Sequence, residues 1–446
     1  MKRIFYLVLF IALSPCFTGN ASANMEFTIN IHLIKEKKEQ DKTVTREEKD
    51  FPMAVELGDT FFSYTRDNKK YIFDFAGRRI FTVDLSDNTY TDDSLFSNIG
   101  FRTYEFQNRL MLSNALDAGG IEDNPMLPAL SEHIFSILQK DKKSELSRTL
   151  KDDFVFYSAE GKGLMSYSKK GTSVSGENKD MFIKFFRYVF GGHPQIIDEL
   201  SSDNIIPGSI RFYRYNAITE DSSMILSEIK TTPERPYSLE GCTPGVPRSS
   251  KDPFTGFLHD VKYSKTADLK KHLEMLISKA EAFYKSRAFM DTMLVYLEYN
   301  LCSGLPFPPA FNNHKTSLVE DKDVTLLISS INPRSKEEAE KSIPILEDFE
   351  KKAGHYGHVI KIFEANIQTG LRNSKRAKEI FYEVLRKSPH ITGVYKDLGD
   401  IYYSEYNAVM AWRCWDTARK IAPDHKMLDP IKEFELKLLK GYPEFF

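Results

Sequence analysis

The stretch LGDIYYSEYNAVMAWRCWDTARKIAP, residues 398–423, decides the fold of the C-terminal part of this chain. Its small residues allow two antiparallel helices to approach closely, its large residues fill the space between helix pairs, and its final proline ends the second helix. The positions that carry this pattern are Leu398, Gly399, Tyr402, Ala411, Trp415, Ala418 and Pro423. The stretch therefore predicts a tightly packed helical hairpin.

Part of the pattern recurs 34 residues earlier, at Ala377, Phe381 and Pro389. This period and spacing resemble the tetratricopeptide repeat, with a strong unit at 392–425 and a weaker one at 358–391. The weaker unit departs from the family pattern at Glu364, Gln368 and Val384. The alternative is an ordinary helical hairpin with a small-residue interface.

The resemblance implies a curved stack of helix pairs that holds another protein chain. In that family the first helix of each pair faces the concave side. The positions equivalent to the family's groove contacts are Lys396, Asp400, Tyr403, Asn366 and Thr369. The alternative for these residues is simple solvation of a helix face.

Fewer than three repeats are rarely stable alone, so further helices should complete the stack. Strong helical patterns occur at 265–287, 289–301, 324–331, 335–352 and 430–440. We therefore expect an α-helical solenoid over 265–446.

The first half of the chain predicts an antiparallel α+β domain over 24–229. Its first segment alternates apolar and polar residues as a half-buried strand does, at Met25, Phe27, Ile29, Ile31 and Leu33. A run of mixed charge from Lys35 to Asp50 then predicts a solvated loop between strands. Prolines and glycines crowd residues 230–264 and predict a linker. The fold class is therefore α+β, with a β-rich N-terminal domain followed by an all-α helical-repeat solenoid.

The segments YIFDF at 71–75, RIFTVD at 79–84 and NTY at 88–90 loosely resemble the half-barrel carriers of bacterial envelopes. In that family a curved sheet wraps a helix layer, and its concave face holds acyl chains. The resemblance implies a cavity lined by Phe61, Tyr71, Phe73, Phe75 and Phe81. The alternative is that these rings fill an ordinary core.

The N-terminus has the features of a secretory signal peptide over 1–23. Lys2 and Arg3 precede a short apolar segment, and small residues around Ala23 fit a cleavage site. Cys16 follows Pro15, which is a poor fit to a lipoprotein site. We expect a periplasmic or secreted protein with no membrane span in the mature chain.

Three cysteines follow the signal peptide, and an odd count in an oxidising compartment suggests one bridge and one free thiol. Cys414 lies within the repeat, where a thiol behaves as a small hydrophobic group. Cys242 and Cys302 lie in stretches rich in proline and glycine, and we predict a disulfide between them.

The chain has no phosphate loop, dinucleotide fingerprint or nucleophile elbow. His355 and His358 have a spacing that two metal ligands could use, but two solvent-facing histidines at a helix start are the preferred interpretation. The sequence GGHP at 191–194 is best explained as a helix stop followed by a turn. We interpret the acidic residues Asp117, Glu122 and Asp123, with Asn124, as a surface loop and not as a calcium site. We therefore expect no cofactor, no metal and no catalytic residue.

These observations favour a non-enzymatic protein-binding scaffold whose partner is an exported or envelope protein. The formal net charge of −2 argues against nucleic acid as a partner. The alternative is a periplasmic carrier of lipids or other hydrophobic ligands that uses the N-terminal sheet. A hydrolase whose site short motifs do not reveal is the third hypothesis.

Overall fold

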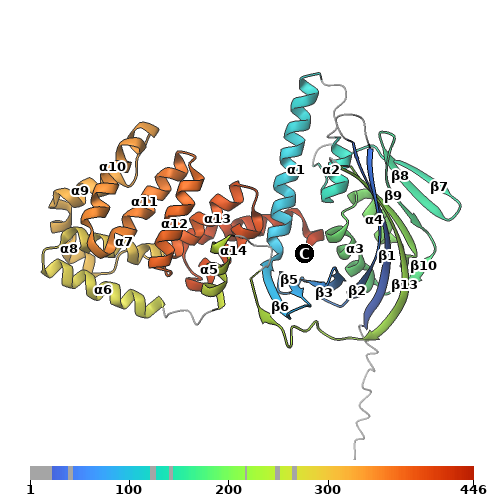
Figure 1. Cartoon of the computed structure of the whole chain (residues 1–446), viewed down its shortest axis with the longest axis horizontal. Helices are drawn as coiled ribbons and strands as arrows, with labels where there is room; N and C mark the ends of the chain where they lie inside the picture. Colours follow the sequence, from blue (N-terminus) through green and yellow to red (C-terminus); the bar gives the residue numbers. More distant parts are fainter. Residues whose placement is uncertain are drawn as a thin grey trace, which may run out of the picture.

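The computed structural model describes residues 23–38, 44–120, 127–139, 144–215, 218–246, 252–263 and 269–446. A large curved sheet forms one end of the molecule and an array of helices forms the other (Figure 1). The sheet comes first in the chain and the helical array second, so the predicted α+β class is confirmed.

The main sheet has the strand order β14-β6-β5-β4-β3-β2-β1-β13-β12-β9-β8-β7. All neighbours are antiparallel except β14 and β6. The strands on one side of the centre are β1 (Ala23–Lys38), β2 (Val44–Leu57), β3 (Phe61–Arg66), β4 (Lys69–Asp74), β5 (Arg79–Asp84), β6 (Thr89–Ser94) and β14 (Thr243–Pro244). Those on the other side are β13 (Ile218–Pro233), β12 (Ser209–Tyr215), β9 (Lys162–Ser168), β8 (Phe154–Ala159) and β7 (Ser147–Lys151), and β10 (Gly171–Ser173) pairs separately with β11 (Ile205–Pro207).

The core of this part lies between the sheet and helix α3 (Gly176–Val189). Met25, Phe27, Ile29 and Ile31 of β1 are all buried, which confirms the predicted alternation. The Phe27 ring packs edge-on against Phe185 of α3. The concave side of the sheet is therefore occupied by the chain's own side chains.

Three more helices belong to this part: α1 (Leu95–Ala118), α2 (Pro128–Phe135) and α4 (Pro194–Ser202). Ser94 caps α1, because its hydroxyl accepts a hydrogen bond from the Phe96 amide. Helix α1 stands between the sheet and the helical array in Figure 1.

The mixed-charge run from Lys35 to Asp50 is not the loop that the sequence predicted. β1 continues to Lys38 and β2 begins at Val44, so most of the run forms a paired ribbon. Opposite charges face each other across this pair, as Glu36 does with Arg46. Cross-strand ion pairs of this kind stabilise a ribbon that has little apolar surface.

The predicted linker at 230–264 also contains regular structure. β13 extends to Pro233, β14 pairs with β6, and α5 (Pro253–Tyr263) packs on a helix near the C-terminus. Pro253 occurs at the start of α5, where a proline is tolerated, because its missing amide hydrogen would have no partner there. The segment is a set of short elements that connects the two parts.

The helical array contains α6 (Leu269–Lys285), α7 (Phe289–Ser303), α8 (Ala310–Glu320), α9 (Lys322–Ser330), α10 (Lys336–Lys352), α11 (Gly357–Gly370), α12 (Ser374–Lys387), α13 (Thr392–Ser404), α14 (Ala408–Ile421) and α15 (Asp429–Gly441). Short 3-10 turns precede α11 and α15 and end the chain at Pro443–Phe445. Consecutive helices pack as pairs along the array, as predicted for 265–352. Helix α8 was not predicted. In the described part of the chain, no helix is long and apolar enough to cross a membrane.

The predicted hairpin at 392–425 is confirmed as helices α13 and α14. A Cβ atom on Gly399 would lie 2.2 Å from Nε1 of Trp415, so only glycine allows this approach. The weaker unit is also a helix pair, formed by α11 and α12.

Helix α14 joins the two parts of the molecule. It packs against α1, α5 and β6. Arg79 of β5 donates to Asp416 of α14 at 2.7 Å and to Asp92 of β6 at 2.5 Å. Arg413 of α14 pairs with Asp93 of β6, with 2.6 Å between Nε and Oδ1. These half-buried ion pairs fix the angle between the sheet and the array.

The end of the chain lies on the concave side of the sheet (Figure 1). Tyr188 of α3 donates a hydrogen bond to the Phe445 carbonyl oxygen at 2.7 Å, and Phe445 is fully buried. The Phe446 ring packs against Phe96 of α1. The C-terminal residues are therefore part of the core of the first half.

The five rings that were predicted to line one cavity lie on two faces of the β3–β5 meander. Phe73 and Phe75 face α3, where both pack against Tyr188. Phe61 and Phe81 face the other way and pack against Tyr237. Because neighbouring side chains on a strand point to opposite faces, these rings cannot line a common cavity.

The predicted disulfide between Cys242 and Cys302 is not formed, and Cys414 is also a free thiol. Cys242 packs beside the outer cluster of Phe61, whereas Cys302 is buried on α7 within the helical array. The two thiols therefore lie in different parts of the core. Their similar surroundings in the sequence did not show this separation.

Replacing Arg79 with alanine should lower the free energy of unfolding by about 3 kcal/mol, because Asp92 and Asp416 would remain half-buried without this partner. Urea unfolding followed by circular dichroism measures this loss. Lys341→Ala, which removes an exposed pair with Glu337, is the control and should change the free energy little. Equal effects of the two substitutions would show that Arg79 does not fix the junction.

Candidate functional site

The structure brings three of the five predicted groove residues together. Lys396 and Asp400 of α13 form an ion pair, and Lys396 also lies 3.9 Å from Asp397. Asn366 of α11 lies close enough to Asp397 to lower the pKa of its carboxyl group. The first helices of the two units thus share a continuous polar strip. Asp397 belongs to this strip and was missed by the sequence analysis.

Asp397 has an unusual environment for a carboxyl group. Burial raises its pKa to about 7, although Lys396 and Asn366 act in the opposite direction. The Asp397 carboxyl group therefore gains and loses its proton near neutral pH. Nothing in the sequence indicated this, because the shift comes from burial in the folded chain.

Tyr403 does not face an open groove. Its ring stacks on Tyr104 of α1 with 5.3 Å between centroids, and its hydroxyl donates to the Gly100 carbonyl oxygen at 3.3 Å. The contact that the repeat resemblance assigned to a partner is made here by the chain's own α1. Thr369 is also internally bonded, since its hydroxyl donates to the Ala365 carbonyl oxygen.

An open groove of about 540 Å³ lies at the other end of the strip, between the α9–α10 connection and the end of α11. Its apolar lining residues are Ile331, Pro333, Ala339, Ile367 and Leu371. Its polar lining includes Asn332, Ser335 and Asn366. Asn366 connects this groove to Asp397, so one predicted groove residue lies in a recess that is large enough for peptide side chains.

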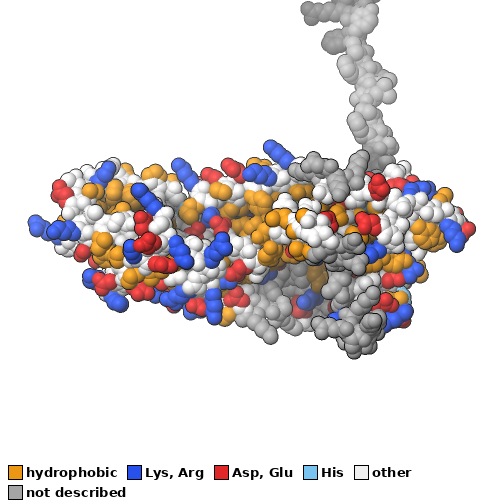
Figure 2. Space-filling view, turned by 90° about the horizontal axis from the view of Figure 1, so that it is seen from above, with side chains coloured by type: hydrophobic (Ala, Val, Ile, Leu, Met, Phe, Trp, Pro, Cys, Tyr) orange, Lys and Arg blue, Asp and Glu red, His pale blue; other side chains and the backbone are white. Residues whose placement is uncertain are grey.

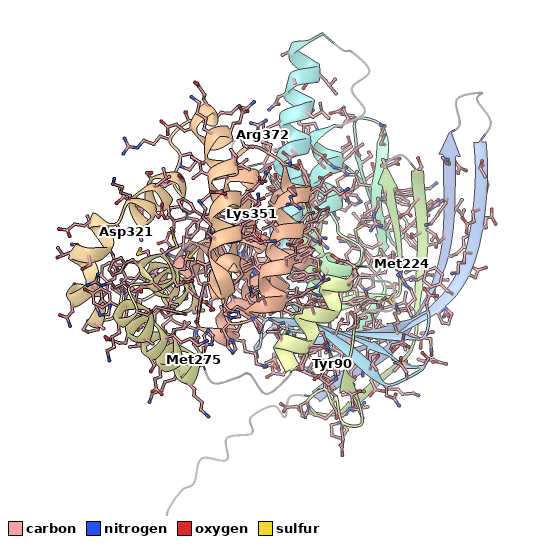
Figure 3. All side chains as sticks on the ribbon, turned by 60° about the vertical axis from the view of Figure 1, so that its left-hand side comes forward. Tyr90, Met224, Met275, Asp321, Lys351 and Arg372 are labelled. Atoms are coloured by element: carbon pink, nitrogen blue, oxygen red, sulfur yellow. The ribbon has the colours of Figure 1, made fainter. Side chains whose placement is uncertain are left out.

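The groove is bordered by positive charge from Arg334, Lys336 and Arg372. All three side chains are exposed, and Lys336 lies 3.8 Å from Glu340. Within the described residues, no ion pair is recorded for Arg334 or Arg372. In Figure 3, Arg372 lies at the opposite edge of the helical array from Met275 of α6. Figure 2 shows acidic and basic side chains intermixed on the visible face of the array.

The GGHP motif forms a buried structural junction. Gly191 and Gly192 have φ angles of 98° and 118°, and His193 caps α4, as the predicted stop and turn require. His193 and Glu132 of α2 are fully buried, with 2.9 Å between Nε2 and Oε2. Burial and the nearby His193 lower the pKa of His133 to about 3. The Glu132–His193 pair therefore holds α2 to α4, and neither side chain is exposed to solvent.

The interpretation of His358 as a solvent-facing residue is wrong. His358 is buried, and its Nε2 lies 3.1 Å from Glu298 of α7. Glu298 also contacts His272 of α6 and accepts a hydrogen bond from Ser388. These residues are separated by up to 116 positions in the chain, so no local spacing could have revealed the cluster.

The acidic residues that were interpreted as one surface loop are only partly within the described chain. Asp117 lies in the last turn of α1. Glu122, Asp123 and Asn124 lie outside the described residues, as do Cys16 and the predicted signal peptide up to Ser22.

Comparison with known proteins gives little further information. No family model matches the chain, and no curated protein matches it. Among solved structures, a lipovitellin structure described for its lipid–protein interactions is similar at 11% identity and a TM-score of 0.20. The match covers 95% of this chain but 56% of the lipovitellin chain, and similarity at this level supports no conclusion about fold or function.

The raised pKa of Asp397 predicts a specific pH dependence of stability. The folded state keeps the proton up to about pH 7, whereas the unfolded chain loses it near pH 4, so folding stability should fall as the pH rises between these values. Asp397→Asn removes this dependence, so the variant should become progressively more stable than the unchanged protein from about pH 4 to about pH 7, with a constant difference above that.

Urea unfolding at a series of pH values measures the difference. Asp424→Asn, at an exposed position after α14, is the matched control. Parallel stability curves for the Asp397 variant and the unchanged protein would show that the carboxyl group titrates normally.

Proposed function

We propose that this protein is a non-enzymatic scaffold that binds another protein through its helical array. The observation that carries the proposal is the groove at the α9–α10 connection, which combines an apolar floor with two arginines that have no recorded ion pair in the described part of the chain. The tetratricopeptide-like spacing of 358–425 supports it, because α11 contributes Asn366 and Ile367 to the groove.

The chemistry of the groove favours an acidic segment of the partner. Arg334 and Arg372 both line the recess, and they come from different segments, one before α10 and the other after α11. Guanidinium groups bind carboxylates through paired hydrogen bonds, and the apolar floor can accept one or two aliphatic side chains. An extended peptide with an apolar residue flanked by Asp or Glu fits both features.

We further infer that the partner is an exported or envelope protein and that the scaffold acts in the periplasm or outside the cell. Support comes from the sequence alone: a basic start, a short apolar segment and a small-residue cleavage site near Ala23.

The structure gives less support to the two other hypotheses. A hydrophobic-ligand carrier needs a cavity on the concave face, and α3 and the buried Phe445 occupy part of that face. A hydrolase needs acids and histidines that can reach a substrate, and the pair at the GGHP motif, Glu132 and His193, is fully buried and does not offer them.

Reversing the charge of both groove arginines, in Arg334→Glu with Arg372→Glu, should weaken binding of acidic peptides about tenfold or more, since attraction becomes repulsion at two positions. Peptides selected on the unchanged protein from a displayed random library, then titrated by fluorescence anisotropy, give the measurement. Binding should also weaken as salt is raised.

The matched control is Arg386→Glu with Lys387→Glu, which makes the same charge change at exposed positions on α12. It should leave the affinity unchanged. Selection of peptides without acidic residues, or equal losses in both double variants, would overturn the assignment of the groove.

A further inference from the structure

Side chains from three helices of the array meet at one point, where His272 and His358 approach Glu298 and Cys302 of α7. Glu298 and Cys302 are four residues apart on α7, so they share one face of that helix. His272 extends from α6 to the same point, and His358 comes from α11. Glu298 is 2% exposed and Cys302 is fully buried.

The distances suit a metal ion. The ligand atoms of His272, Glu298 and Cys302 lie within 4.8 Å of one another. Nε2 of His272 is 3.4 Å from Oε1 of Glu298. Two ligands that are each about 2.0–2.1 Å from a tetrahedral zinc ion are about 3.4 Å apart, which is the separation found here.

The ring of His272 lacks the hydrogen bond that such a buried position requires. Its Nε2 is buried and makes no hydrogen bond with the described residues, although the carboxylate oxygen is near. The ring is held in place by stacking on His390, with 4.5 Å between centroids. A buried ring nitrogen that lies close to a carboxylate and a thiol and has no hydrogen-bond partner is suited to bind a cation.

The other contacts of Glu298 resemble the outer contacts that orient metal ligands. His358 Nε2 lies 3.1 Å from Oε2, the oxygen that faces away from His272, and Ser388 donates to Oε1 at 2.7 Å. Such partners fix the direction of a ligating carboxylate.

We propose that His272, Glu298 and Cys302 form a binding site for a zinc-type divalent cation, with His358 as a positioning residue for the carboxylate. Nitrogen, oxygen and sulfur together are a donor set that zinc accepts and that magnesium and calcium do not. Water completes the fourth position on the side of His272, whose side chain is 16% exposed. Binding transfers the Cys302 thiol proton to solvent as the zinc–sulfur bond forms, and no electron is exchanged.

The pH dependence of binding follows from the ligand set. Zinc binds the deprotonated forms of cysteine, glutamate and histidine, and protons compete with it for all three. Zinc uptake should therefore weaken as the pH falls.

The test uses the full chain, purified under reducing conditions, equilibrated with zinc sulfate and then desalted. Mass spectrometry of the metal content should find about one zinc ion per chain, and zinc should raise the melting temperature. Cobalt in place of zinc should give an absorption band in the near ultraviolet from the bond between cobalt and the Cys302 thiolate.

Cys302→Ser and His272→Ala should each lose retained zinc, and Cys302→Ser should lose the cobalt–thiolate band. His355→Ala, an exposed histidine three residues before His358, is the matched control and should keep both. The proposal is overturned if the unchanged protein retains no zinc or gives no thiolate band, or if the Cys302 and His272 variants retain as much zinc as the control. The cobalt spectrum of the unchanged protein decides the question even where a variant fails to fold.

Discussion

The contact of Trp412 with Gly100 determines how the two parts of this protein are joined. A Cβ atom on Gly100 would lie 2.5 Å from the Trp412 ring, so α1 and α14 meet at a distance that only glycine permits. The fully buried indole also donates a hydrogen bond to Glu435 of α15 at 2.8 Å. Around this contact, Arg79 and Arg413 form ion pairs between the sheet and α14. Apolar burial supplies the attraction, and the charged groups fix the orientation.

The contact between α1 and α14 gives the α13–α14 hairpin a role inside the molecule. The α13–α14 hairpin uses Tyr403 and the neighbouring Tyr406 to stack on Tyr104, so one side of it is covered by α1. A helix pair that resembles a binding repeat serves here to attach the array to the sheet. The accessible recess lies further from the sheet, at the α9–α10 connection and α11. The proposed cation site lies where α7 meets α6 and α11.

Local patterns in the sequence predicted the local structure well. The alternation from Met25 to Ile31 identified β1, and the spacing around Gly399 identified a helix pair whose close approach at Gly399 is confirmed. Contacts between distant segments could not be predicted in this way. Nothing near Tyr403 indicates that Tyr104 covers it, and nothing near His358 indicates Glu298, because one sequence contains no information on which exposed faces meet. The prediction of a disulfide was wrong for the same reason. Cys242 and Cys302 have similar surroundings in the sequence but different surroundings in the folded chain.

The central claim is that the α1–α14 contact makes the sheet and the array one cooperative unit. The chain has two tryptophans, Trp412 and Trp415, and both lie in α14, so tryptophan fluorescence reports on this junction. Urea unfolding followed by fluorescence, and in parallel by hydrogen exchange of the β1 and β13 amides, tests the claim directly. If the sheet and the array unfold together, both signals should show one transition with the same midpoint. A fluorescence change at lower urea, while the β1 and β13 amides remain protected, would contradict it.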